Sequence, residues 1–232
     1  MTHCLHHGLP PSLRVGKMVL IPKTPRPSPD PALYRPITLL PTLTRLLFKV
    51  LDTKIRTHLT DSGFQFPIEQ GGFLPRRNTH LQGFLLLLLR DYARHRHQNL
   101  FVAFLDVRKA FDTIHHVQLL KVLRSLHLPE PFINAIHRLL VDFKVDILGE
   151  WVKIEKGVFQ GSPLFPLLCI LFLLDLVAFL NGDEASAFHG TEFPWSSPLV
   201  QTVIRLLCFA DDIALLASSL EQLQLALQII QE

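Results

Sequence analysis

Hydrophobic residues recur at helical spacing in several stretches of the chain. The stretches that predict helices on this pattern are residues 45–59, 81–92, 119–126, 132–140 and 220–230. Ser218 precedes the last of them and Glu221 lies in its first turn, and the two have the spacing of a capping box. We therefore expect several helices that each bury one face.

Other stretches predict strands. Residues 100–107, LFVAFLDV, form a short apolar run of the kind found in strands buried on both faces. Hydrophobic and charged residues alternate over residues 141–155 on both sides of Gly149, which predicts an antiparallel hairpin. Residues 19–21 are a further short strand candidate, whereas residues 22–41 contain seven prolines and predict a stiff extended loop.

Composition narrows the class of protein. The 232 residues are 48% hydrophobic and 19% charged with a net charge of +3, which excludes a wholly disordered chain and allows one large or two small domains. The mild positive charge permits a polyanionic partner without arguing for one. Cys4, Cys169 and Cys208 do not form a disulfide framework and fit a reducing compartment.

The most apolar segment is residues 164–180. It is 17 residues long and contains Pro166 and Asp175, whereas a membrane-spanning helix needs about 20 apolar residues. We therefore interpret it as a buried core helix and expect no membrane partner. A membrane-associated protein is the alternative that this segment and the mean hydropathy of +0.28 suggest.

Two adjacent carboxylates, Asp211 and Asp212, lie between apolar runs. Neighbouring acids repel each other and lose hydration in apolar surroundings, so a cation is needed to favour them there. The flanks have strand composition, which predicts that the pair lies at the tip of a hairpin. The alternative is a solvated Asp-Asp turn without a ligand.

A third acid, Asp106, ends the stretch FVAFLD, residues 101–106, within the apolar run at residues 100–107. One carboxylate at a strand end and two at a hairpin tip can hold two Mg²⁺ ions about 3.5–4 Å apart. Such a pair of ions stabilises both the attacking and the leaving oxygen of a phosphoryl displacement.

Five stretches, in this order along the chain, resemble motifs of reverse transcriptases. The finger-region motifs are LIPK…YRPITLLPTLTRLLFKVL and EQGGFLPRRNTHLQ, and the palm motifs are FVAFLDVRKAFDTI, GVFQGSPLFPLLCILFL and CFADDIALLA. The subgroup that they most resemble is the non-LTR (LINE-type) retrotransposon enzyme, and the match covers about residues 19–217.

This resemblance implies an α+β fold, the polymerase right hand, with a small antiparallel palm sheet backed by helices. The fingers region would be residues 1–98 and the palm residues 99–232, with residues 113–150 packing partly with the fingers. No stretch resembles a thumb or an endonuclease domain, and we expect those regions to belong to a longer polypeptide.

The resemblance also implies roles for single residues. Asp106, Asp211 and Asp212 match the acids that hold two Mg²⁺ ions, with Mn²⁺ as an alternative ion, and Phe209 takes the aromatic place of the aromatic-x-Asp-Asp turn. The residues that match the nucleotide-binding positions are Lys23, Arg35, Phe111, Gln160 and Gly161. Lys23 and Arg35 would grip the triphosphate, and Arg76 and Arg77 would contact phosphates of the template.

Phe111 would close the sugar pocket and leave no room for a 2′-hydroxyl, while Gln160 and Gly161 would contact the incoming nucleotide. Without the motifs, Phe111 is a core residue, residues 160–163 are a helix start, and Lys23 and Arg35 belong to a solvated surface. The chain departs from the family at Phe159, where a Pro is usual, and at Phe165, where a small polar residue is usual. We expect both rings to strain the template contact.

The expected function is that of an RNA-directed DNA polymerase. Its partners would be an RNA template, a DNA primer and deoxynucleoside triphosphates. The alternatives are a truncated, non-catalytic retrotransposon remnant that at most binds nucleic acid, and another palm-type nucleotidyl transferase such as a cyclase.

Overall fold

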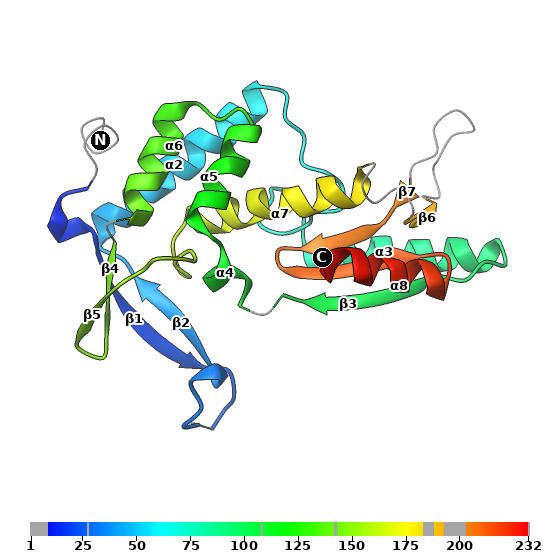
Figure 1. Cartoon of the computed structure of the whole chain (residues 1–232), viewed down its shortest axis with the longest axis horizontal. Coiled ribbons are helices and arrows are strands. Elements are labelled where there is room, and N and C mark those ends of the chain that lie inside the picture. Colours follow the sequence, from blue (N-terminus) through cyan, green and yellow to red (C-terminus); the bar gives the residue numbers. More distant parts are fainter. Residues whose placement is uncertain are drawn as a thin grey trace. The chain divides into compact units, whose positions relative to one another are not determined.

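The computed structural model describes residues 9–26, 28–107, 109–141, 143–182, 188–192 and 203–231 (Figure 1). The helices are the 3₁₀ turns η1 (Pro11–Leu13) and η2 (Pro31–Leu33) and the α-helices α2 (Thr42–Asp61), α3 (Thr79–His95), α4 (Ala110–Thr113), α5 (His116–Ser125), α6 (Glu130–Val141), α7 (Phe165–Asn181) and α8 (Leu220–Gln231). The strands are β1 (Val15–Pro22), β2 (Tyr34–Leu39), β3 (Phe101–Asp106), β4 (Lys144–Ile147), β5 (Glu150–Lys153), β6 (Thr191–Glu192), β7 (Val203–Ile204), β8 (Leu206–Phe209) and β9 (Asp212–Ala217).

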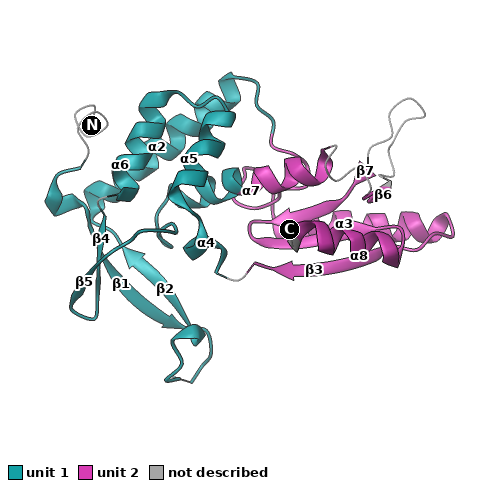
Figure 2. Cartoon of the chain, viewed as in Figure 1, with its two compact units in different colours: residues 1–65, 109–172 teal, residues 66–108, 173–232 magenta. Residues whose placement is uncertain are grey.

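The chain divides into two compact units (Figure 2). Unit 1 comprises residues 1–65 and 109–172, and unit 2 comprises residues 66–108 and 173–232. These bounds do not follow the predicted division at residue 98, so the assignment of fingers and palm to residues 1–98 and 99–232 stays a prediction.

Unit 1 contains a four-stranded sheet in the order β2-β1-β4-β5. The pair β4/β5 is antiparallel and turns at Leu148 and Gly149, which have φ of 56° and 96°, so the hairpin predicted over residues 141–155 is confirmed. The prediction of a loop throughout residues 22–41 is wrong, because β2 forms within it. Pro36 of β2 pairs with Leu20 of β1. β2 is an edge strand, where a residue that lacks an N–H is tolerated.

The core of unit 1 holds a chain of phenylalanine rings. The ring centroids are 4.5 Å apart for Phe143 and Phe159, 5.2 Å for Phe159 and Phe165, and 5.4 Å for Phe165 and Phe48. All four side chains are buried. The two departures from the reverse transcriptase pattern therefore lie in one core cluster and pack against each other.

Unit 2 is built around a three-stranded antiparallel sheet in the order β3-β9-β8. On one face, Leu85 and Leu89 of α3 pack against a cluster that includes Leu207 and Leu216. β3 is an edge strand and Phe104 is 75% exposed, so the prediction that this strand is buried on both faces is wrong.

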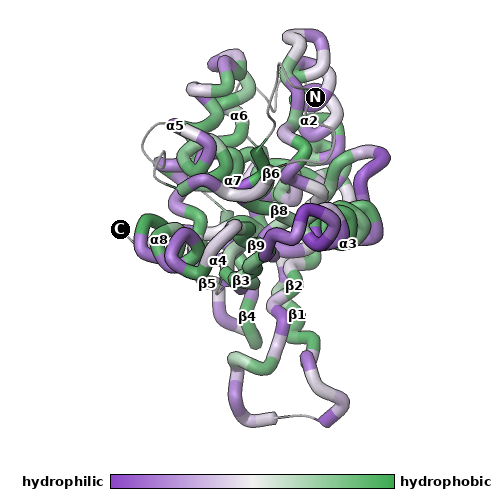
Figure 3. Tube along the Cα trace, turned by 90° about the vertical axis from the view of Figure 1, so that its right-hand side faces the viewer, coloured by the Kyte–Doolittle hydropathy of each residue, from purple (hydrophilic) through white to green (hydrophobic). Residues whose placement is uncertain are grey.

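The other face of this sheet packs against α8 and the last turns of α7. α8 carries hydrophobic and hydrophilic residues around its turns (Figure 3), and its Leu223 and Ala226 are buried against Leu215 and Cys208. Unit 2 thus consists of a sheet with helices on both faces. Successive residues of β8 and β9 point to opposite faces, and both faces carry hydrophobic residues that pack against helices.

The predicted helices are confirmed, with ends that differ by a few residues. At the start of α8 the capping oxygen belongs to Ser219, which accepts from the N–H of Gln222 at 3.2 Å, and the predicted cap at Ser218 is wrong by one residue. In the described part of the chain, no helix is long and apolar enough to cross a membrane. Cys169 and Cys208 are both buried, Cys208 as a free thiol, and Cys4 lies outside the described residues.

Candidate active site

The acid pair lies at a tight turn between two strands. β8 and β9 are joined through Ala210 and Asp211, and Phe209 pairs with Asp212 across the hairpin. Ala210 has φ of 57°, in the left-handed region that an alanine adopts at a cost of about 1–2 kcal/mol. The predicted hairpin tip is confirmed, with Asp211 in the turn and Asp212 at the first position of β9.

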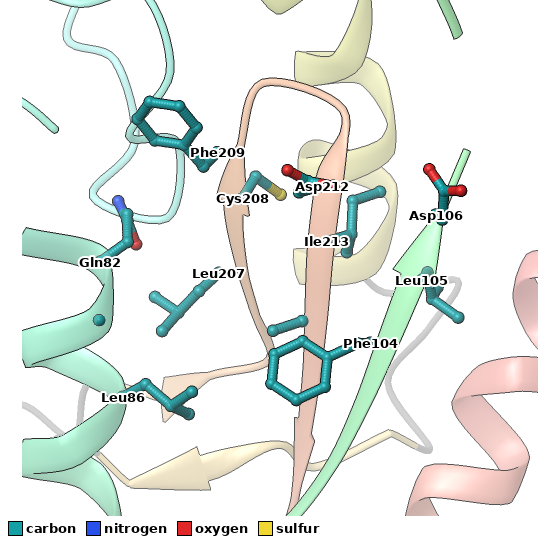
Figure 4. A pocket seen from close by; sticks show the side chains of 12 residues that line it. Gln82, Leu86, Phe104, Leu105, Asp106, Leu207, Cys208, Phe209, Asp212 and Ile213 are labelled. Atoms are coloured by element: carbon teal, nitrogen blue, oxygen red, sulfur yellow. The ribbon is translucent and has the colours of Figure 1, made fainter. Parts of the chain in front are cut away.

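The third acid lies directly across the sheet from this turn. Asp106, the last residue of β3, is the register partner of Asp212 (Figure 4). Residues paired in this way have Cα atoms about 4.5–5.5 Å apart and side chains on the same face. Asp106 and the adjacent pair Asp211 and Asp212, which are far apart from it in the sequence, therefore lie at the same end of the sheet of unit 2.

The electrostatics of this end of the sheet are unfavourable for Asp211. Burial raises the pKa of the Asp211 carboxyl, its own backbone N–H opposes that shift, and the negative charges of Asp212 and Asp106 raise the pKa further. A nearby divalent cation would remove this penalty, and carboxylate oxygens are the ligands that Mg²⁺ prefers. The donor set therefore fits such an ion in chemistry, although the described side chains include no group of three or more acids, histidines or cysteines gathered closely enough to hold a metal.

A pocket of about 390 Å³ borders two of the acids (Figure 4). Its lining comes from α3 and from all three strands of the sheet, and consists of Gln82, Gly83, Leu86, Phe104, Leu105, Asp106, Leu207, Cys208, Phe209, Asp212, Ile213 and Ala214. Phe104 and Asp106 lie on the same face of β3, since residues two apart on a strand share a face. Asp106 and Asp212 therefore lie at one end of a largely apolar pocket in unit 2.

The five residues predicted to bind nucleotide all belong to unit 1. Arg35 pairs with Ile21 across β1 and β2, and the N–H of Lys23 donates to the carbonyl of Leu33 at 2.8 Å. Both basic side chains are exposed. The Lys23 ammonium donates to the carbonyl of Ala32 at 3.1 Å.

Gln160 and Gly161 lie between β2 and the segment that follows Lys109. The N–H of Thr38 donates to the carbonyl of Gln160, and the N–H of Val158 donates to the carbonyl of Phe111, both at 2.8 Å. Gly161 has φ of 103°, and a Cβ there would lie 3.0 Å from the carbonyl oxygen of Thr38. The structure thus brings the segments that carry Phe111, Gln160 and Arg35 side by side.

Asp112 is a residue of this region that the sequence did not single out. Burial raises the pKa of its carboxyl, while the charge of Lys109, a hydrogen bond with the Gln160 side chain and the charge of Lys23 oppose that shift. The hydrogen bond with Gln160 and the charge of Lys23 link this carboxylate to two of the predicted nucleotide-binding residues. An acid directly after Phe111 was the available signal, and nothing in the sequence shows that it contacts Gln160.

Arg77 has a different environment from the one expected. Its guanidinium donates to the carbonyls of Phe66, at 2.8 Å, of Gln70, at 2.7 Å, and of Pro67. These bonds fix the loop before α3, and we therefore assign Arg77 to the support of that loop.

The chain is similar in sequence to known proteins. The sequence model of the family described as "Reverse transcriptase (RNA-dependent DNA polymerase)" matches residues 21–232. The chain is 32% identical over 236 residues to the Retrovirus-related Pol polyprotein from type-1 retrotransposable element R2 of Nasonia vitripennis, over 98% of this chain and 21% of that protein. It is 29% identical to the corresponding polyprotein from the R2DM element of Drosophila melanogaster, over 95% of this chain and 20% of that protein.

Among solved structures, the chain is similar to apo telomerase from Candida tropicalis truncated from its C-terminal domain. The TM-score is 0.59 at 15% identity, over 97% of this chain and 47% of that one, and a likeness at this identity shows the fold alone. The predicted α+β reverse transcriptase fold is thereby confirmed. The chain spans about a fifth of the length of the curated relatives that it matches. Because the family match extends over nearly all of its residues, the chain belongs to the reverse transcriptase (RNA-dependent DNA polymerase) family, with relatives among the non-LTR retrotransposons.

Proposed function

We propose that the chain carries the catalytic centre of an RNA-directed DNA polymerase. The reaction would join the 3′-oxygen of a DNA primer to the α-phosphorus of a deoxynucleoside triphosphate, selected by an RNA template, with breakage of the bond to the departing pyrophosphate. The observation that carries this proposal is the pairing of Asp106 with Asp212 across β3 and β9, with Asp211 in the adjoining turn.

Asp106, Asp211 and Asp212 would hold two Mg²⁺ or Mn²⁺ ions. Such ions, when bound, activate the primer hydroxyl and neutralise the charge that develops on the phosphate oxygens. The raised pKa of Asp211 supports this assignment, because a carboxylate destabilised by burial and by two like charges gains most from a cation. The contribution of the protein is to fix these carboxylates in position, which needs no protein nucleophile.

The nucleotide would be bound by residues of unit 1. Lys23 and Arg35 would contact the triphosphate, the first as a compact charge and the second as a bidentate fork. Gln160 and Gly161 would contact the nucleotide, and the Phe111 ring would exclude a 2′-hydroxyl. This assignment is supported by the backbone hydrogen bonds that join the segments of Phe111, Gln160 and β2.

The test is primer extension on an RNA template with Mg²⁺ and the four deoxynucleotides. Asp211→Asn should abolish extension with the fold kept, as judged by circular dichroism. The matched control is Asp91→Asn, which removes an exposed carboxylate of the same unit that is ion-paired with Arg90 at 2.7 Å and should extend at the wild-type rate. Folded wild-type protein that binds primer–template but never extends it would contradict the proposal and favour a non-catalytic remnant.

A further inference from the structure

A short segment before α3 runs alongside the acid turn in unit 2. The N–H of Cys208 donates to the carbonyl of Glu69 and the N–H of Gly71 donates to the carbonyl of Cys208, both at 2.7 Å. These two bonds form a parallel bridge between Gln70 and Cys208. Residues 69–72, which we call the turn brace, thus lie beside the end of β8.

The side chain of Gln70 forms hydrogen bonds with both the N–H and the carbonyl of the turn residue Ala210. Gln70 is fully buried, and its Oε1 accepts from the N–H of Ala210 at 3.0 Å and from the N–H of Gly72 at 2.8 Å. Its Nε2 donates to the carbonyl of Ala210 at 3.4 Å. A buried amide with these partners constrains a residue whose left-handed backbone is unfavourable and persists where its surroundings determine it.

Gly72 contacts the same turn through its backbone. A Cβ on Gly72 would lie 2.2 Å from the nitrogen and 2.7 Å from the Cα of Ala210, so no other residue fits without moving the turn. A Cβ on the neighbouring Gly71 would instead meet the Gln82 side chain, 2.5 Å from its Cγ and its Nε2, and no atom of the turn is among its nearest neighbours. The two glycines therefore differ in what a methyl group would displace, the turn in one case and a side chain in the other.

We propose that Gln70 and Gly72 are positioning residues that fix the Ala210–Asp211 turn and thereby the orientation of the Asp211 and Asp212 carboxylates for metal binding. This inference rests on the proposed function. Asp211 follows Ala210 directly and Asp212 follows Asp211, so a displaced turn moves both acids away from Asp106 on the neighbouring strand. Groups that orient metal ligands from outside the coordination sphere typically change affinity or activity about 10–100-fold when they are removed.

A Mn²⁺ binding measurement tests the turn brace without relying on activity. Binding is detected by the loss of the electron paramagnetic resonance signal of the free ion. Gln70→Met keeps the length of the side chain and removes its hydrogen bonds, and Gly72→Ala presses on the turn from outside. Each should weaken Mn²⁺ binding about tenfold or more. Gly71→Ala is the matched control and should change the affinity less than about twofold, while Asp211→Asn gives the value for a damaged site.

A purely structural role is separated from a positioning role by extension kinetics. In the folded variants, kcat for deoxynucleotide addition should fall while KM for the nucleotide stays within about twofold, and excess Mg²⁺ should restore part of the rate. Folding is judged by circular dichroism and urea midpoints. Folded Gln70→Met and Gly72→Ala proteins that bind Mn²⁺ as the wild type does would overturn the inference, and so would loss of folding in both variants.

The proposed function can fail separately. If Mn²⁺ binds in an Asp211-dependent way but no extension occurs, the polymerase activity is refuted, and the Mn²⁺ affinities of the variants still decide the role of the brace. Mn²⁺ binding that Asp211→Asn leaves unchanged would refute the metal site and the brace together.

Discussion

Phe159 and Phe165 pack edge to face, with ring centroids 5.2 Å apart and ring planes inclined by 60°. These are the two positions at which the chain departs from the reverse transcriptase pattern. Phe159 directly precedes Gln160, so the rings support the segment proposed to contact the nucleotide. A large side chain at one position is matched by a large side chain at the other, and the rings pack into the core.

The packing of these rings predicts a large and coupled loss of stability. Phe165→Ala and Phe159→Ala should each lower the free energy of unfolding by about 3–5 kcal/mol, because both rings are buried. The double variant should reveal a coupling of about 0.5–1.5 kcal/mol in urea unfolding. Phe104→Ala, at a ring that is 75% exposed, is the control and should change the free energy of unfolding by less than about 0.5 kcal/mol. Strictly additive losses would contradict direct packing of the two rings.

Phe111 should determine the choice of sugar. Replacing its ring with the methyl group of Phe111→Ala opens space for a 2′-hydroxyl, so the ratio of kcat/KM for deoxynucleotides to that for ribonucleotides should fall about 10–100-fold. Parallel single-nucleotide incorporation assays measure this ratio. Phe132→Ala, which removes a ring of the same unit that packs on His58, should leave the ratio unchanged. An unaltered ratio in Phe111→Ala would remove the steric role.

Asp211 should make the protein less stable at neutral pH than in acid when divalent ions are absent. Because burial and the charges of Asp212 and Asp106 raise the pKa of Asp211 in the folded state, its favourable contribution is fully present below the unfolded pKa of about 3.9 and is lost as the pH rises through the folded pKa. Asp211→Asn should therefore have a higher free energy of unfolding than the wild type at pH 7 and no such advantage near pH 3.

Added Mg²⁺ should reverse this order, because an ion that binds the folded state stabilises it by mass action. Urea unfolding at the two pH values, with and without Mg²⁺, measures both effects. A wild type that is as stable as Asp211→Asn at pH 7 without Mg²⁺ would contradict the raised pKa of Asp211, and with it the burial and the charge repulsion that cause it.

Cys208 should be unreactive in the folded protein. Burial, with a smaller effect from Glu69, raises the pKa of its thiol to about 12. A thiol with this pKa has roughly a thousandth of the thiolate of a free cysteine at pH 8, and alkylation should slow accordingly. Mass spectrometry after iodoacetamide treatment in buffer and in urea gives the ratio of rates. Modification of Cys208 in buffer within tenfold of the rate in urea would contradict its burial beside the turn brace.

The sequence predicted those features that depend on neighbouring residues. The alternation around Gly149 indicated the β4/β5 hairpin, and the apolar runs on both sides of Asp211 and Asp212 indicated a turn between two strands. The edge strand β2 was missed because the prolines around it favour a loop. The exposure of Phe104 was missed because a buried and an edge strand can have the same composition.

The support of the acid turn was also missed, for a physical reason. Gln70 acts on Ala210, which lies 140 residues away in the sequence, and an isolated Gln beside two glycines carries no local signal for such a contact. Asp112 was missed for the same reason, because its hydrogen-bond partner Gln160 belongs to another motif. Strand ends and turns follow from local pattern, whereas the groups that orient them follow from tertiary contacts.

Single-turnover incorporation of one deoxynucleotide opposite an RNA template base tests the pairing of Asp106 and Asp212 most directly. The proteins to compare are the wild type, Asp106→Asn, Asp212→Asn and the double variant. Carboxylates that hold the same ions act as a unit, so each single variant should lose about a hundredfold or more and the double variant should lose no more than the worse single variant. Incorporation at the wild-type rate by either single variant would refute a shared metal site at this end of the sheet.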